Sequence, residues 1–188
     1  MNSNDTTNPA GNEALAMPAA AILADGACDV DQLLAQVAQR QQAAGRRLGG
    51  LLMKPRGTAR DCAVDMVLTD LSTGADYLVS QPRGAAGTGC RADLQGFARA
   101  SQVLRHALVD APDLVISNRF GGLEALGQGF RAELLALLSQ GLPLLTAVAP
   151  KHLSDWRAFV GGPAELPAEL PAIEAWIEAV LAARRAAA

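Results

Sequence analysis

Short apolar runs alternate with amphipathic segments along most of the chain. Apolar runs bounded by turn residues predict strands, whereas apolar positions three or four residues apart predict helices. Residues 62–80 hold two runs around Ser72-Thr73-Gly74 and predict an antiparallel hairpin. The other predicted strands are 20–24, 48–53, 114–117 and 142–148. The first predicted helix is capped by Asp31 and ends at Gly45. The other predicted helices are 94–108, 130–139, 151–159 and 173–185.

Strands that alternate with helices predict an α/β fold: a three-layer αβα arrangement around a mainly parallel sheet, with the hairpin as an antiparallel addition. Residues 1–18 lack periodicity, so we expect a disordered leader followed by a single α/β domain over 19–188. Ligands of such sheets bind beyond the carboxyl ends of the strands. Three loops should therefore meet there, 25–28, 83–93 and 118–131.

Charge and composition exclude several classes of protein. The formal charge is -3, from 16 Lys and Arg against 19 Asp and Glu, whereas a nucleic-acid surface needs a concentrated basic face. No apolar run reaches the roughly 18 residues that a membrane helix needs. The first twenty residues lack the basic start and apolar block of a secretory signal. We therefore expect a cytoplasmic protein whose 3 cysteines are free thiols.

The first strand is followed by the turn where a phosphate-binding loop would lie. Its sequence, ADGACDVDQLL, places Val30 and Asp31 where a Walker loop has Lys and Ser or Thr. Asp31 would repel a triphosphate, so the segment does not match an active P-loop. Two interpretations remain: Asp25-Gly26 is a tight turn with Asp31 as a helix cap, or this turn contacts a small anion through helix amides.

Asn118 and Arg119 stand at the end of the strand 114–117, where nucleotide hydrolases carry acids for magnesium. An arginine only donates hydrogen bonds and a neutral amide is a weak ligand, so this pair does not hold a metal. Arg119, together with Arg131, is suited to clamping an oxyanion, and Gly121-Gly122 allows close backbone approach. The structural alternative is a salt bridge from Glu124 to either arginine.

The segment GTGCRAD combines backbone amides, a thiol and a guanidinium in Gly89, Cys90 and Arg91. A thiol beside an arginine is more thiolate-like. The plainest interpretation of Cys28 and Cys62 is that they are buried and inert, while Cys90 is open between packing and ligand contact. The three cysteines lack metal-ligand spacing.

Trp156 and an apolar stripe near the C-terminus each allow two interpretations. Trp156 either packs on its own helix face or lines a pocket or dimer seam. The stripe either joins two copies in a homodimer or covers the sheet. Its members are Leu166, Ile173, Trp176, Ile177, Val180 and Leu181.

Four segments, CAVDMVLTDLSTG, SQPRGAAGTGCRAD, NRFGGLEALGQGFRAEL and LTAVAPKHLSDWRAFVGG, resemble an uncharacterised bacterial family of domains of unknown function. The resemblance runs from about residue 20 to 176. Members of that family are often encoded near molybdate ABC transporter genes or described as molybdenum transport ATP-binding proteins. The resemblance implies a molybdenum context and no particular mechanism.

A more distant resemblance is to thermophile-type P-loop nucleoside triphosphatases, in the order of strand, phosphate turn, DLSTG hairpin and NRFGGLE. Gly121 and Glu124 match that pattern, but those enzymes have acids where this chain has Asn118 and Arg119. Both catalytic motifs are altered. The resemblance therefore implies a P-loop-like fold and puts hydrolysis in doubt.

The favoured hypothesis is a non-hydrolytic P-loop-like domain that binds a small oxyanion, with molybdate or tungstate suggested by the family context alone. One alternative is a nucleotide-binding or nucleotide-hydrolysing enzyme with Glu124, Asp31 or Asp65 as a base; another is a homodimeric partner of a transporter, such as a molybdate transporter component. We predict neither catalytic residues nor a metal site. The predicted ligand-binding residues are Asp25, Gly26, Asp31, Gly89, Cys90, Arg91, Asn118, Arg119, Gly121, Glu124 and Arg131, with further oxyanion contacts possible at Cys62.

Overall fold

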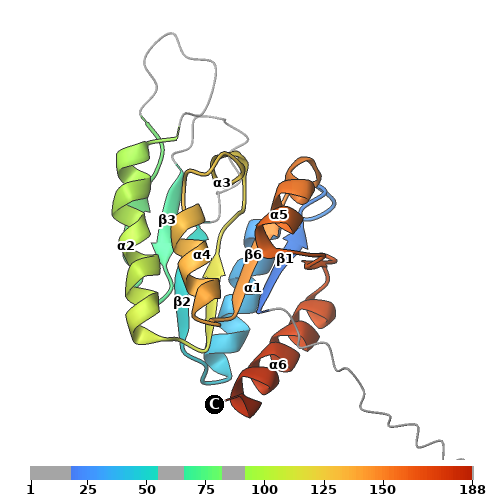
Figure 1. The fold of residues 1–188 in the computed structure, drawn as a ribbon. Helices are drawn as coiled ribbons and strands as arrows, with labels where there is room; N and C mark the ends of the chain where they lie inside the picture. Colours follow the sequence, from blue (N-terminus) through green and yellow to red (C-terminus); the bar gives the residue numbers. More distant parts are fainter. Residues whose placement is uncertain (1–17, 55–65, 82–91, 188) are drawn as a thin grey trace, which may run out of the picture.

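A computed structural model describes residues 18–54, 66–81 and 92–187 of the chain (Figure 1). Strands and helices alternate along most of it, as the sequence predicted. The strands are β1 (Ala19–Leu23), β2 (Leu48–Met53), β3 (Val67–Asp70), β4 (Asp76–Leu78), β5 (Leu114–Ser117), β6 (Leu144–Val148) and β7 (Glu165–Leu166). The helices are α1 (Val30–Ala43), α2 (Leu94–Asp110), α3 (Gly122–Ala125), α4 (Arg131–Ser139), the 3-10 turn η1 (Pro150–His152), α5 (Leu153–Val160) and α6 (Leu170–Ala186).

All of the described strands form one sheet in the order β4-β3-β2-β5-β6-β1-β7. Neighbours from β2 to β7 run parallel, while β3 and β4 form an antiparallel hairpin at one edge. The predicted fold class is thus confirmed. The carbonyl of Pro18, within the predicted leader, already accepts a hydrogen bond of 2.7 Å from the Leu144 amide and extends the β1–β6 ladder by one residue.

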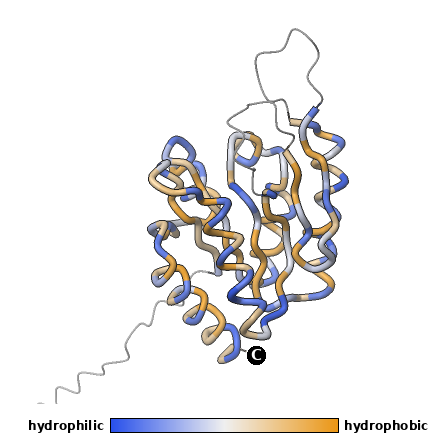
Figure 2. Tube along the Cα trace, turned by 180° about the vertical axis from the view of Figure 1, so that it is seen from behind, coloured by the Kyte–Doolittle hydropathy of each residue, from blue (hydrophilic) through white to orange (hydrophobic). Residues whose placement is uncertain are grey.

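Helices cover both faces of the sheet and give two apolar cores. One core joins the sheet to α2, α4 and α5, and the other joins it to α1 and α6. Figure 2 shows that hydrophobic positions are concentrated on the strands between these layers. The central strands β5 and β6 are buried along their whole length, because helices pack on both of their faces.

The apolar stripe of α6 covers the sheet. Ile173, Ile177, Val180 and Leu181 are buried in the core shared with α1. Ion pairs from Arg40 to Glu174 and from Arg46 to Glu178 join α6 to α1 and to the turn that follows α1. Of the two interpretations of the stripe, the structure shows the second for these four residues, while Leu166 and Trp176 are partly buried against the same core.

Trp156 packs inside the protein, as expected if it belongs to the packing face of its helix. Its indole is fully buried, lies edge-on to the Phe120 ring at 5.4 Å between centroids, and donates a hydrogen bond of 3.1 Å to the carbonyl of Ala164. That carbonyl also accepts the Ala21 amide at 2.8 Å. Trp156 therefore fixes the start of β7 against β1.

The structure corrects the start of α1 and adds two elements. The N-cap is Asp29 and not Asp31, because the Asp29 carboxylate accepts the amides of Asp31 and Gln32 while Val30 is already buried in the first turn. Neither α3 nor β7 was predicted. Both are short and lie in segments rich in Gly or Pro, so they lack periodicity.

Candidate functional site

The parallel sheet has a switch point between β1 and β6. From β1 the chain leaves through α1 toward β2, whereas from β6 it leaves through α5, on the other face, toward β7 at the opposite edge. A crevice at the carboxyl end of such a strand pair is where ligands of open α/β sheets bind. In Figure 1 this is the upper end of the sheet, where α3 lies.

Arg119 crosses this edge to the first turn of α1. The chain after β5 continues beside β6, because the Phe120 amide donates to the Ala147 carbonyl at 2.8 Å. From there Arg119 donates through Nη2 and Nε to Oδ1 of Asp31, at 3.0 and 3.3 Å. The Arg119 side chain is 48% exposed and that of Asp31 18% exposed. Two predicted ligand residues thus meet, as an internal ion pair.

Carboxylates satisfy the amides at the start of α1. Asp29 accepts two of them as N-cap, and Oδ1 of Asp25 accepts the Ala27 amide at 2.9 Å across Gly26. With Asp31, three acids surround this turn. A triphosphate would meet repulsion here, because the helix amides are already engaged and the local charge is negative.

Glu124 has a structural arrangement that the sequence analysis did not foresee. Its buried carboxylate accepts the Gly121 amide through Oε2 and the Phe130 amide through Oε1, both at 3.0 Å. Gly129 has φ +59°, and a Cβ there would lie 2.2 Å from Oε1. Glu124 therefore fixes both ends of the loop after β5 and forms a salt bridge with neither Arg119 nor Arg131.

Arg131 has its own partners. Its Nη1 donates to the backbone carbonyl of Glu124 at 3.1 Å, and its guanidinium lies 4.7 Å from the centre of the Phe159 ring. Such stacking on an aromatic face is favourable for arginine. The described contacts therefore place Arg119 and Arg131 on different partners, and no shared pair of guanidinium groups forms from these two residues.

Asn118 lies at the end of β5 and is largely buried. Its Oδ1 accepts the Met53 amide at 3.1 Å and ties the end of β5 to the end of β2. A hollow of about 210 Å³ adjoins it. The hollow is lined by Met53, Met66, Leu68, Val79, Phe97, Asn118, Arg119, Gly121, Gly122, Leu123, Glu124 and Phe130.

The loop after β6 also reaches this edge, although the sequence analysis treated His152 as an ordinary residue. A Cβ at Gly122 would lie 3.7 Å from Cε1 and Nε2 of His152, so the loops after β5 and β6 are in contact. Nδ1 of His152 is 3.6 Å from Oδ2 of Asp155. The available signal was position alone, since His152 closely follows a buried parallel strand.

The remaining predicted residues divide into two groups. Gly89, Cys90, Arg91 and Cys62 lie outside the described residues. Cys28 is exposed in the turn after β1, so its interpretation as a buried thiol was wrong; an N-terminal helix turn rich in Asp and Gly stays on the surface. Within residues 18–54, 66–81 and 92–187, no group of three or more His, Cys, Asp or Glu side chains is placed to hold a metal ion.

Comparison with known proteins identifies the family. The chain belongs to the DUF2478 family, described as a protein of unknown function, whose model matches residues 19–176. A relative is the molybdenum import ATP-binding protein ModC 2 of Bradyrhizobium diazoefficiens, which is 39% identical over 158 residues. The match covers 84% of this chain and 18% of that protein, so the chain corresponds to a small part of its relative.

The chain is therefore related to a molybdenum import ATP-binding protein, as the resemblance implied. The helices in the described part of the chain are too short or too polar to cross a membrane.

Proposed function

We propose that this member of the DUF2478 family is a non-hydrolytic module that binds a small oxyanion, with molybdate or tungstate as the ligand, in molybdenum uptake or homeostasis. The observation that carries the proposal is the half-exposed guanidinium of Arg119 at the carboxyl edge of the sheet. Asn118, Gly121 and Gly122 line the same hollow. This is the edge at which α/β folds of this kind bind their ligands.

Arg119 has a hydrogen-bonding edge to offer to an anion. A planar guanidinium carries five N–H donors on two edges. Asp31 accepts from Nε and Nη2, and Nη1 donates no hydrogen bond to another of the described residues. An oxyanion whose oxygens match the spacing of the guanidinium nitrogens can accept two charge-assisted hydrogen bonds from Nη1 and Nη2. It can also displace Asp31 and accept from Nε and Nη2 instead.

The acids around α1 support a small ligand over a nucleotide. Asp25, Asp29 and Asp31 oppose a triphosphate on the first turn, which lacks the lysine and hydroxyl of a Walker loop. A compact dianion bound to Arg119 needs none of these amides. Asp31 then acts as an internal competitor, which keeps Arg119 paired when the ligand is scarce.

The relative supports the molybdenum context. This chain matches only a small part of a protein named for molybdenum import and ATP binding, and its sequence contains no Walker motif of the form GxxxxGK followed by Ser or Thr. The partial match is consistent with a module that senses or holds the transported oxyanion, while nucleotide hydrolysis is carried out by another domain or protein.

Calorimetric titration tests the proposal. We expect binding heat with molybdate and tungstate, its loss in Arg119→Ala, and its retention in Arg105→Ala, which removes an exposed arginine paired with Glu133 on the α2–α4 face. Absence of heat with molybdate, tungstate, sulfate and phosphate contradicts the proposal. Binding of ATP followed by magnesium-dependent release of phosphate favours the enzyme alternative.

A further inference from the structure

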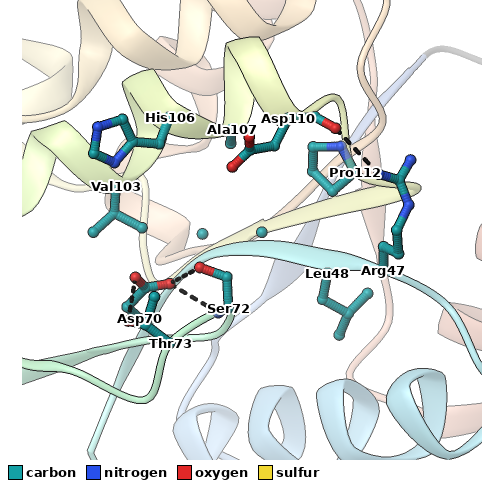
Figure 3. Close-up of a pocket in the computed structure, with 12 residues that line it drawn as sticks. Arg47, Leu48, Asp70, Ser72, Thr73, Val103, His106, Ala107, Asp110 and Pro112 are labelled. Atoms are coloured by element: carbon teal, nitrogen blue, oxygen red, sulfur yellow. Dashed lines mark hydrogen bonds between the residues drawn. The ribbon is translucent and has the colours of Figure 1, made fainter.

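A second hollow lies at the opposite, amino edge of the parallel strands, between α2, the start of β2 and the turn that joins β3 to β4 (Figure 3). Its volume is about 270 Å³, near the lower end of the roughly 300–1,000 Å³ of small-molecule sites. The turn is the DLSTG motif, to which the proposed oxyanion site assigns no role. The hollow is therefore a separate candidate for ligand binding.

Two consecutive glycines in β2 form the floor of this hollow. A Cβ at Gly49 would lie 2.9 Å from Cγ of Pro112, so the end of α2 sits close to the strand. Gly50 has φ +110°, and a Cβ there would lie 2.0 Å from the carbonyl oxygen of Ile116. Neither position accepts a side chain without displacement of backbone or ring atoms. Glycine at both positions therefore allows Pro112 and the Ile116 backbone to lie close to this strand at the floor of the hollow.

One wall of the hollow presents two hydroxyl groups that already donate their hydrogens in hydrogen bonds. Asp70 is buried and accepts hydrogen bonds from Oγ of Ser72 at 2.7 Å and from Oγ1 of Thr73 at 2.6 Å. Burial raises the pKa of the Asp70 carboxyl, but these hydrogen bonds lower it below its ordinary value. The carboxylate is therefore charged and only accepts. Ser72 and Thr73 line the hollow. The Ser72 hydroxyl oxygen is left as an acceptor, while Oγ1 of Thr73 already accepts the Ala75 amide at 3.2 Å and keeps one further lone pair.

The other wall contributes a further acceptor. Asp110 is the last residue of α2, where a carboxylate is unfavourable because the helix carbonyls point the same way. Figure 3 shows its carboxylate on the side of the helix that faces β2, and no ion pair engages it within the described residues. Arg47 also lines the hollow, and its guanidinium donates to the carbonyls of Asp110 and Ala111 at 3.2 and 3.0 Å.

We infer that this hollow binds a small organic ammonium ion with an apolar body. The carboxylate of Asp110 and the oxygens of Ser72 and Thr73 would accept its N–H groups. The apolar part would lie against Val103, Ala107 and Pro112, which line the same space. Arg47 and His106 also line the hollow, but the Arg47 guanidinium is engaged with two backbone carbonyls. The acceptors therefore favour a cation over an anion, which is the opposite charge preference to that of the site at Arg119.

Nuclear magnetic resonance of the ¹⁵N-labelled full chain tests the inference with benzylammonium as the probe. We expect saturable shifts of the amides of Gly49, Gly50, Ser72 and Thr73. Benzyl alcohol and benzoate, which keep the ring but lack the charge or reverse it, should give no saturable shift. Butylammonium, which resembles the end of a lysine side chain, should bind several-fold more weakly, because it covers less of the apolar wall.

Two variants make the test specific. Asp110→Asn should weaken benzylammonium binding by about fivefold or more, because it removes the charged acceptor. Glu169→Gln, which removes an exposed carboxylate at the start of α6 on the opposite face, should leave binding unchanged. Equal responses to benzoate or benzyl alcohol, unaltered binding in Asp110→Asn, or no saturable shift at all would each overturn the inference. Butylammonium binding as tight as benzylammonium would assign the site to a lysine-like chain and overturn the role of the apolar wall.

Discussion

The guanidinium of Arg119 lies 3.0 Å from the carboxylate of Asp31, 88 residues away in sequence, across the carboxyl ends of β6 and β1. The two side chains come from loops that both follow buried parallel strands. Their pairing brings the first turn and the loop after β5 together at this edge of the sheet. Under the proposed function, an anion that binds Arg119 has to compete with the Asp31 carboxylate.

The buried carboxylate of Glu124 should be essential to the loop that carries Arg119. Replacing Glu124 with Gln exchanges one acceptor for a donor, which leaves the amide of Gly121 or Phe130 unpaired and should lower the free energy of unfolding by about 1–3 kcal/mol. Gly129→Ala should destabilise by a comparable amount, because its Cβ meets Oε1 of Glu124. Urea denaturation measures both. Wild-type stability in both variants would contradict this role, and Gly127→Ala is a control at a similar φ without a neighbour within 4 Å.

Two buried and unpaired hydroxyl groups on neighbouring strands should lower the free energy of unfolding. Oγ of Ser117 and Oγ1 of Thr146 are buried without a hydrogen-bond partner within the described residues. Thr146→Val keeps the shape and removes the unpaired group, so it should raise the free energy of unfolding by about 1–3 kcal/mol. Thermal denaturation monitored by circular dichroism tests this. A lower melting temperature for Thr146→Val would show that the hydroxyl has a partner in solution.

Asp70 should stabilise the protein only when ionised. Its pKa is lowered from 3.8 in the folded state, mainly by hydrogen bonds that outweigh the effect of burial. The stabilisation is therefore fully present above pH 3.8 and is lost as pH falls through the folded pKa. Asp70→Asn should be less stable than wild type by about 1–2 kcal/mol at pH 7, and the difference should shrink only as the pH falls below 3.8. A difference that stays constant down to the acid transition would contradict the assignment.

The α6 stripe should act in folding and not in assembly. Ile177 is fully buried between α6, α1 and the sheet, so Ile177→Ala should lower the free energy of unfolding by about 2–5 kcal/mol through the cavity it leaves. The mass measured by light scattering should be the same as for wild type. A lower mass of Ile177→Ala with an unchanged free energy of unfolding would indicate that the stripe forms a subunit interface. Glu178→Gln, on the exposed side of the same helix, should have a small effect on both quantities.

The fold was predictable from the sequence because periodicity survives in every long element. The strand 48–53 and the hairpin around Ser72-Thr73-Gly74 were predicted where they occur, since their apolar runs end at turn residues. The cap of α1 was misplaced by two residues, because Asp29 and Asp31 are equally suitable in type and only burial of Val30 decides between them. The edge strand β7 was missed, because it is placed by the hydrogen bonds of Ala21 and Trp156 to the carbonyl of Ala164, just before the strand, and not by a local sequence pattern.

The edge at which Arg119 and Asp31 meet was predictable from the sequence, whereas their pairing was not. The rule that ligands lie beyond parallel strand ends brought Arg119 and Asp31 to one edge, where they indeed meet. It did not show that they neutralise each other, nor that Glu124 binds backbone amides, because such partners depend on side-chain direction after the loop has folded. The role of Gly129 beside Glu124 likewise became visible only from the distance between them.

The central claim is that Arg119 binds a small oxyanion in competition with Asp31. The most direct measurement is the affinity for molybdate, by isothermal titration calorimetry, of wild type, Arg119→Ala, Asp31→Asn and the control Asp25→Asn, which removes a neighbouring carboxylate that is not paired with Arg119. The account predicts a loss of about tenfold or more in Arg119→Ala, a gain of up to about fivefold in Asp31→Asn, and a smaller change in Asp25→Asn. Equal affinity in wild type and Arg119→Ala, or weaker binding in Asp31→Asn, would contradict it.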